Sequence, residues 1–148
     1  MKYLNKIFFH LEEINVTEPI IVIVEYNSFF GKDRAISVPY NENFVRNVAH
    51  YSNLFFGASL KSFYELAKRK SYSFIGCNSA ENNAYFVRND KLNNNVKVVS
   101  IDDGFVEEKF RQSRDKDGNL TFISGEEKAN ILLGLEVVNT VTNKIEKF

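Results

Sequence analysis

The sequence predicts a single domain of the mixed α/β class, and three observations support this prediction. The chain has 148 residues, which is enough for one modest hydrophobic core. Apolar residues make up 44% of the sequence and charged residues 26%, the usual balance of a globular protein. Stretches with helical spacing alternate with short runs of β-branched and aromatic residues, as expected when helices and strands share one core.

The first elements are predicted to be a helix and a buried strand. Apolar residues in segment 2–14 are spaced three and four positions apart, which places them on one helical face. The run Ile20–Val24 has no polar alternation, a pattern typical of a central parallel strand that is buried on both faces. The strand ends in Glu25, Tyr26 and Asn27, at the edge where open α/β sheets bind ligands.

A long loop and a second helix follow. Residues 28–53 contain one short apolar segment, at 35–38, that could be a short strand. Long loops in compact domains are usually functional or carry some structure of their own. Residues 54–70 have an apolar helical face and end in three basic residues, which suits the negative end of a helix dipole. We therefore expect a helix over 54–70.

The rest of the chain is predicted to be a hairpin followed by small elements. Two aromatic and β-branched runs, 72–77 and 84–87, flank a polar turn and predict an antiparallel hairpin. Beyond it we expect helices at 102–112 and 125–134 and a weak strand or tail over 137–148. We therefore expect residues 1–95 to form the main unit and residues 96–148 a helical extension packed on the same domain.

Composition excludes several classes of function. Basic and acidic residues number 19 each, so the basic surplus typical of nucleic-acid binding is absent. Cys77 is the only cysteine, which precludes an internal disulfide and suits a reducing compartment. Polar residues interrupt the N-terminal apolar run, and no stretch is long enough for a membrane span. We therefore expect a cytoplasmic protein without a membrane span.

Metal binding is not predicted either. No His or Cys cluster has the spacing of zinc ligands. Four residues match positions of a calcium-binding loop, but Leu120 stands where that loop requires glycine. We expect a simple turn there; the four residues are Asp115, Asp117, Asn119 and Glu126.

Short strings along the chain form a recognisable set. They are EYN at 25–27, FGKDRA at 30–35, VPY at 38–40, AHYS at 49–52, FGASL at 56–60, GCNS at 76–79, NNAYFV at 82–87 and FRQSR at 110–114. This set resembles bacterial S-adenosylmethionine-dependent methyltransferase-like proteins related to the FkbM type, which are often encoded in polysaccharide gene clusters. The resemblance covers nearly the whole chain.

The resemblance implies a particular part of a fold. The order of a helix, a buried parallel strand, a long loop, a helix and an antiparallel strand pair, with small C-terminal helices, is similar to the C-terminal half of a Rossmann-like methyltransferase sheet. In that family an earlier glycine-rich loop and an acidic strand end hold the cofactor, and this sequence contains no such loop. We therefore expect no cofactor-binding residues in this chain alone, although the complete family protein implies S-adenosylmethionine.

Two residues are candidates for catalysis. Glu25 could bind a sugar hydroxyl or a substrate amine at the strand end, or it could pair with Arg34 or Arg46 to fix the loop. His50 could act as a general base, or be a hydrogen-bonded loop histidine. The candidates for substrate binding are Tyr26, Asn27, Arg34, Tyr40, Tyr51, Asn78, Asn82 and Asn83.

Two functional hypotheses remain open. In the first, the chain is a fragment or separately encoded C-terminal segment of a methyltransferase-like protein, inactive alone, and forms the acceptor side of a cleft. By family analogy the acceptor is a sugar or glycan precursor, and the partner is an N-terminal half. In the second, the chain is a non-catalytic interaction module that pairs with a partner, or with itself, through an exposed sheet edge.

Overall fold

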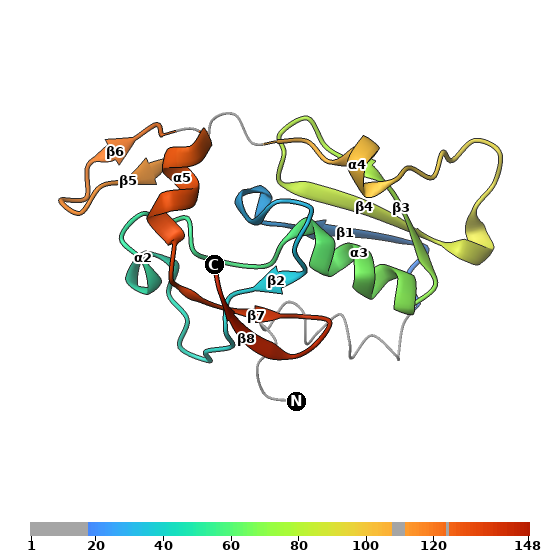
Figure 1. Cartoon of the computed structure of the whole chain (residues 1–148). Coiled ribbons are helices and arrows are strands. Elements are labelled where there is room, and N and C mark those ends of the chain that lie inside the picture. Colours follow the sequence, from blue (N-terminus) through green and yellow to red (C-terminus); the bar gives the residue numbers. More distant parts are fainter. Residues whose placement is uncertain (1–17, 108–111, 124) are drawn as a thin grey trace.

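The computed structural model describes residues 18–107, 112–123 and 125–148, so the helix predicted over residues 2–14 lies outside the described residues (Figure 1). The described residues form two three-stranded sheets, one two-stranded hairpin and several short helices. The predicted α/β class is confirmed. All the strand pairings are antiparallel.

The first sheet has the strand order β1-β4-β3. Strand β4 (Asn83–Arg88) lies in the middle and pairs antiparallel with β1 (Ile21–Glu25) and with β3 (Tyr72–Cys77). The hairpin β3-β4 confirms the predicted antiparallel pair. Because both outer strands run antiparallel to β4, β1 and β3 run in the same direction.

The predicted surroundings of β1 were wrong in two respects. No parallel neighbour of β1 occurs among the described residues, and its partner is the antiparallel β4. Val24 is buried, whereas Ile21 and Ile23 are 56% and 58% exposed. A β-branched run specifies an extended backbone, but it does not specify which neighbours cover each face of the strand.

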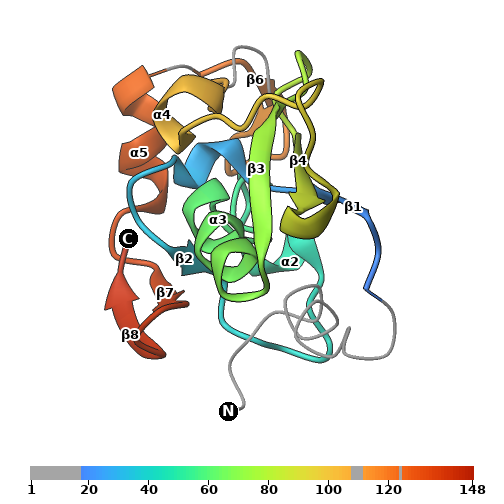
Figure 2. The ribbon, with the colours of Figure 1, turned by 90° about the vertical axis from the view of Figure 1, so that its right-hand side faces the viewer.

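Helix α3 (Leu60–Arg69) precedes β3 in the sequence and covers one face of the first sheet (Figures 1 and 2). It begins later than predicted because Gly57 has a φ of 65° and the Ser59 hydroxyl accepts a hydrogen bond from the Ser62 amide. The helix buries Leu60, Phe63 and Leu66 in a core shared with the first sheet; the sheet side of this core includes Val24, Phe74, Ala84 and Phe86.

The second sheet joins distant parts of the chain. Strand β7 (Glu136–Asn139) pairs antiparallel with β2 (Ile36–Ser37) and with β8 (Lys144–Lys147). The segment predicted as a weak strand or tail is therefore a hairpin. It packs on a second apolar cluster whose buried members are Phe30, Ile36, Val38, Leu54, Phe55, Leu132 and Val137.

Helix α3 also contacts this second sheet. The Ser62 hydroxyl donates a hydrogen bond to the Ile36 carbonyl of β2, and the Thr140 hydroxyl donates to Ser62. In the region of the predicted helix at 102–112 the structure has the short α4 (Ile101–Gly104), which ends because the backbone is extended at Phe105; residues 108–111 lie outside the described residues. The remaining elements are η1 (Ser28–Phe30), α2 (Arg46–Ala49), η2 (Asn89–Lys91), α4 (Ile101–Gly104), β5 (Ser113–Arg114), β6 (Leu120–Thr121) and α5 (Gly125–Leu132).

Candidate functional site

The C-terminal end of β1 presents one exposed carboxylate and two buried side chains. Glu25 is exposed and lies opposite Asn83 of β4 in the strand register. Tyr26 is buried, its hydroxyl donates to the Val106 carbonyl at 3.3 Å, and its ring packs against Phe105. Glu25, predicted to be catalytic, and Tyr26, predicted to bind substrate, therefore lie in different environments.

Asn27 is completely buried and connects the strand end to the segment before α3. Its side-chain amide donates to the carbonyls of Leu54 and Phe56, each at 2.9 Å. Its side-chain oxygen accepts the Phe29 amide at 3.1 Å, which caps η1. These three bonds fix the course of the chain around the strand end.

A polar cleft of about 870 Å³ lies beside this strand end. The Asn82 carbonyl, in the β3-β4 turn, accepts the Tyr26 amide at 2.9 Å, which connects the strand end directly to the cleft. Three segments that are distant in sequence, 45–53, 79–82 and 112–120, line the cleft. Its lining residues are Val45, Arg46, Asn47, Asn53, Ser79, Ala80, Glu81, Asn82, Gln112, Arg114 and Leu120.

Contacts within the protein hold both arginines of the polar cleft. The Arg46 guanidinium lies 3.7 Å from the centre of the Phe56 ring, and its Nε donates to the Asn53 carbonyl at 2.7 Å. Arg114 donates through Nη1 to the Gly118 carbonyl and through its backbone amide to Ser52. The cations are therefore positioned by the fold before any ligand binds.

One side-chain acceptor among the cleft-lining residues has no hydrogen-bond partner within the part of the chain that the structure describes. The side-chain oxygen of Asn53 is buried and has no hydrogen-bond partner. Asn53 has a φ of 60°, a left-handed conformation that asparagine tolerates better than most residues. A buried acceptor without a donor is unusual in native proteins and calls for a partner.

The three predicted asparagines of the β3-β4 turn are grouped together. The Asn78 side-chain oxygen accepts the backbone amides of Asn82 and Asn83, and its amide donates to the Asn82 side chain at 2.9 Å. Asn78 thus shapes the turn. Of these three, Asn82 lines the polar cleft.

His50 and Tyr51 form a pair outside the lining of the polar cleft. Their rings lie 4.3 Å apart, and His50 Nδ1 is 2.7 Å from the Ser52 hydroxyl. Burial lowers the pKa of His50 below its usual value, which favours the neutral imidazole.

The two remaining predicted residues lie elsewhere. Arg34 pairs with Glu146 of β8 at 3.2 Å and donates to the Lys147 carbonyl. Tyr40 lines a separate hollow with Pro39 and Phe44. Among the ten predicted site residues, the cleft lining therefore includes Asn82.

Sequence reasoning missed most of the polar cleft. The sequence suggests Arg46 only as a possible ion-pair partner of Glu25, and it gives no signal for Asn53. Gln112 and Arg114 belong to the string at 110–114 that contributes to the family resemblance, which was the one available signal.

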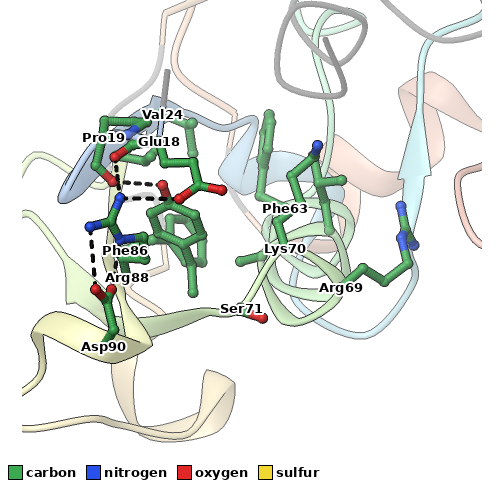
Figure 3. Close-up of a pocket in the computed structure, with 14 residues that line it drawn as sticks. Glu18, Pro19, Val24, Phe63, Arg69, Lys70, Ser71, Phe86, Arg88 and Asp90 are labelled. Atoms are coloured by element: carbon green, nitrogen blue, oxygen red, sulfur yellow. Dashed lines mark hydrogen bonds and ion pairs between the residues drawn. The ribbon is translucent and has the colours of Figure 1, made fainter. Parts of the chain in front are cut away.

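A second cavity, the apolar groove, has a volume of about 520 Å³ and lies between β1 and α3 (Figure 3). Its floor includes Val22 and Val24 from the strand and Phe63 from the helix. At its rim Arg88 pairs with Asp90 at 2.6 Å and with Glu18 at 3.5 Å. The hydrogen bond from Arg88 holds the pKa of Asp90 below its usual range.

The described residues offer no metal site and no reactive thiol. No group of three or more His, Cys, Asp or Glu side chains in the described part of the chain could hold a metal ion. Burial raises the pKa of the Cys77 thiol, which favours the uncharged form. The turn predicted at 115–119 is confirmed, because the Asp115 carboxylate accepts the backbone amides of Asp117 and Asn119. No helix in the described segments is long and apolar enough to cross a bilayer.

The fold and the site together define a mixed α/β protein with a polar, ligand-sized cleft beside a strand end. In comparisons with known proteins, no family model, no curated protein and no solved structure matches the chain.

Proposed function

We propose that this chain is the acceptor-side segment of a methyltransferase-like protein, and that a second unit supplies the cofactor-binding half. The observation that carries the proposal is the first sheet, which combines an antiparallel hairpin at one side with an unoccupied edge at the other. In the described residues β1 pairs only with β4. The resembled fold also ends in an antiparallel hairpin at its sheet edge.

Among the described residues the second edge of β1 has no partner strand, and the outer face of β1 beside that edge is apolar. Ile20, Ile21 and Ile23 are each more than half exposed. The apolar groove opens beside the same strand, with Val22 and Val24 in its lining. An open strand edge with apolar side chains favours pairing with another chain, so these features support a second unit docked at β1.

The C-terminal end of β1 supports the assignment of the acceptor side. Glu25 is an exposed carboxylate beside a turn whose Asn82 lines the polar cleft. A carboxylate there can accept a hydrogen bond from an acceptor hydroxyl and take its proton during transfer. In this proposal the second unit binds S-adenosylmethionine, and the acceptor is a sugar or glycan precursor.

The alternative function is a non-catalytic interaction module. The observation that favours it is the same exposed edge, because pairing there needs no cofactor and no acceptor. The two functions differ in what the assembled complex binds. A methyltransferase complex binds S-adenosylmethionine, whereas an interaction module binds only its partner.

The test is calorimetry with S-adenosylmethionine on the isolated chain and on the chain coexpressed with a candidate glycine-rich half. We expect no micromolar binding by the isolated chain and clear binding by the pair. Micromolar binding by the isolated chain would overturn the division into two halves. Co-purification without any cofactor binding would favour the interaction module.

Glu25→Gln in the same reconstituted pair tests the acceptor side. Because Glu25 is exposed, its loss should shift the melting temperature by only a few degrees while methyl transfer falls sharply. Removing one partner of a buried ion pair instead costs about 3–5 kcal/mol. A fall in melting temperature of more than about 10 °C with unchanged activity per folded molecule would make Glu25 structural.

A further inference from the structure

The polar cleft contains more positive than negative charge in a fixed arrangement. Arg46 and Arg114 line it from different segments, and Glu81 is the carboxylate among the lining residues. The guanidinium of Arg46 is stacked on Phe56, and that of Arg114 is bonded to the Gly118 carbonyl. Arginine suits carboxylate and phosphate groups because its planar fork can donate two parallel hydrogen bonds.

The same cleft is rich in side-chain amides. Asn47, Asn53, Asn82 and Gln112 line it, and each amide carries both donors and an acceptor. That combination matches hydroxyl groups, which also donate and accept.

The size of the cleft and its apolar side chains restrict the class of ligand further. A volume of about 870 Å³ is within the usual range for small-molecule sites. Val45 and Leu120 contribute apolar surface and are 52% and 48% exposed, which suits the C–H face of a sugar ring. Among the described residues one carboxylate, Glu81, lines the cleft, which is too few for a dedicated divalent-cation site.

We propose that the polar cleft binds an acidic sugar, a pyranose that carries a carboxylate or phosphate group. The arginines bind the acid, and the amides bind the hydroxyls. Binding of an acidic sugar to this cleft does not require the proposed function. Only the role of that sugar as a methyl acceptor rests on it.

The experiment is a titration of the ¹⁵N-labelled full chain, followed by NMR, with glucuronate, glucose 1-phosphate and uncharged glucose. Both acidic sugars should shift the amide signals of cleft residues, and glucose should bind at least about tenfold more weakly. The two acidic probes distinguish a carboxylate ligand from a phosphate ligand. Equal affinity for glucose and for the acidic sugars, or shifts outside the cleft only, would overturn the inference.

Three variants test the residues. Arg114→Gln should lower acidic-sugar affinity about tenfold or more and leave glucose binding unchanged. Asn53→Asp keeps the side-chain shape and its backbone conformation but adds a negative charge, so it should abolish acidic-sugar binding. Arg69→Gln removes an exposed charge elsewhere on the chain and serves as the control, with no change expected. Unchanged affinity in folded Arg114→Gln would overturn the inference.

These outcomes are separable from those of the proposed function. Sugar binding is measured on the chain alone, whereas the cofactor test requires a second unit. A chain that binds acidic sugars but never forms a cofactor-binding complex would retain this inference and lose the methyltransferase proposal.

Discussion

Asn27 shows how one side chain can organise a strand end. It has no exposed surface and makes three hydrogen bonds to three different backbone groups. The segment that it holds continues into Ala58 and Ser59 and thus sets where α3 begins. A polar residue after a buried strand can therefore stabilise the fold instead of binding a ligand. The path of the chain around the strand end decides which of these two roles the residue has.

Asn27→Ala should lower the free energy of unfolding by about 2–4 kcal/mol, because it removes three hydrogen bonds, including the buried one to the Leu54 carbonyl. Urea unfolding followed by circular dichroism would measure the change. Asn94→Ala, at an exposed position, is the control and should stay within about 0.5 kcal/mol of the parent. Equal stabilities for the two variants would show that the three bonds contribute nothing.

His50 should make stability depend on pH near neutrality. Burial lowers its pKa in the folded state, so the unfolded chain binds the additional proton more readily. The contribution is fully present above the unfolded pKa of about 6.5 and is lost as the pH falls through the folded value. Stability should thus fall between about pH 7 and pH 5.

His50→Gln should remove that part of the pH dependence. The carboxylates whose pKa values are lowered, such as Asp90 and Asp115, lose their contribution only at lower pH. Chemical unfolding of both proteins at a series of pH values would test this. An identical slope in the variant would show that His50 titrates alike in the folded and unfolded states.

At the scale of elements, the exposed edge and face of β1 control association. The chain should self-associate as its concentration rises, because β1 exposes Ile21 and Ile23 and has one edge without a partner strand in the described segments. Replacing both isoleucines with lysine should reduce association and leave the fold intact, since both side chains are already exposed. Light scattering over a concentration series would measure this.

A matched control lies on α2, where Val48 is 79% exposed and far from β1 in the sequence. Val48→Lys should leave association unchanged if β1 is responsible. A parent chain that stays a monodisperse monomer at high concentration would contradict the prediction.

Local signals predicted the local elements. The β3-β4 hairpin was predicted because its two runs flank a polar turn, and α3 was predicted from its apolar stripe. The start of α3 was misplaced because Gly57 adopts a positive φ and Ser59 forms the cap. The pairing of β2 with β7 could not be predicted, since a strand as short as Ile36–Ser37 exists only through a partner about a hundred residues away.

The candidate site follows the same division. The strand end was proposed from the sequence, and Asn82, one of the residues predicted to bind substrate, lies in the lining of the polar cleft. The polar cleft was not found, because Arg46, Asn53 and Arg114 come together only through the Ser52–Arg114 backbone bond and the Arg46–Asn53 bond. Such contacts between distant segments leave no periodic pattern in the sequence.

At the scale of the molecule, α3 links two sheets into one structure. Its apolar face packs on the first sheet, and its Ser62 hydroxyl bonds to β2 of the second. The C-terminal hairpin closes the second sheet, and the Thr140 amide donates to the Ala35 carbonyl at 2.8 Å. The last part of the chain therefore completes the second apolar cluster, to which residues of the loop 28–53 also belong.

Deleting residues 135–148 should destabilise the whole protein. The deletion removes Val137 and Val138, which are completely buried, and uncovers Ile36 and Val38. Each fully buried valine contributes about 1.5–3 kcal/mol, and small domains have only about 5–15 kcal/mol in total. We expect the truncated chain to lose cooperative unfolding, as measured by circular dichroism during heating.

A pair of single substitutions checks the same conclusion without removing a segment. Val138→Ala should cost about 2 kcal/mol, because it removes buried methyl groups from a packed site. Val141→Ala lies in the turn of the same hairpin, where Val141 is 55% exposed, and should change little. If the truncated chain unfolds cooperatively at the parent temperature and both substitutions are neutral, the hairpin is an appendage. The polar cleft and the strand end would then depend on residues before 135 alone.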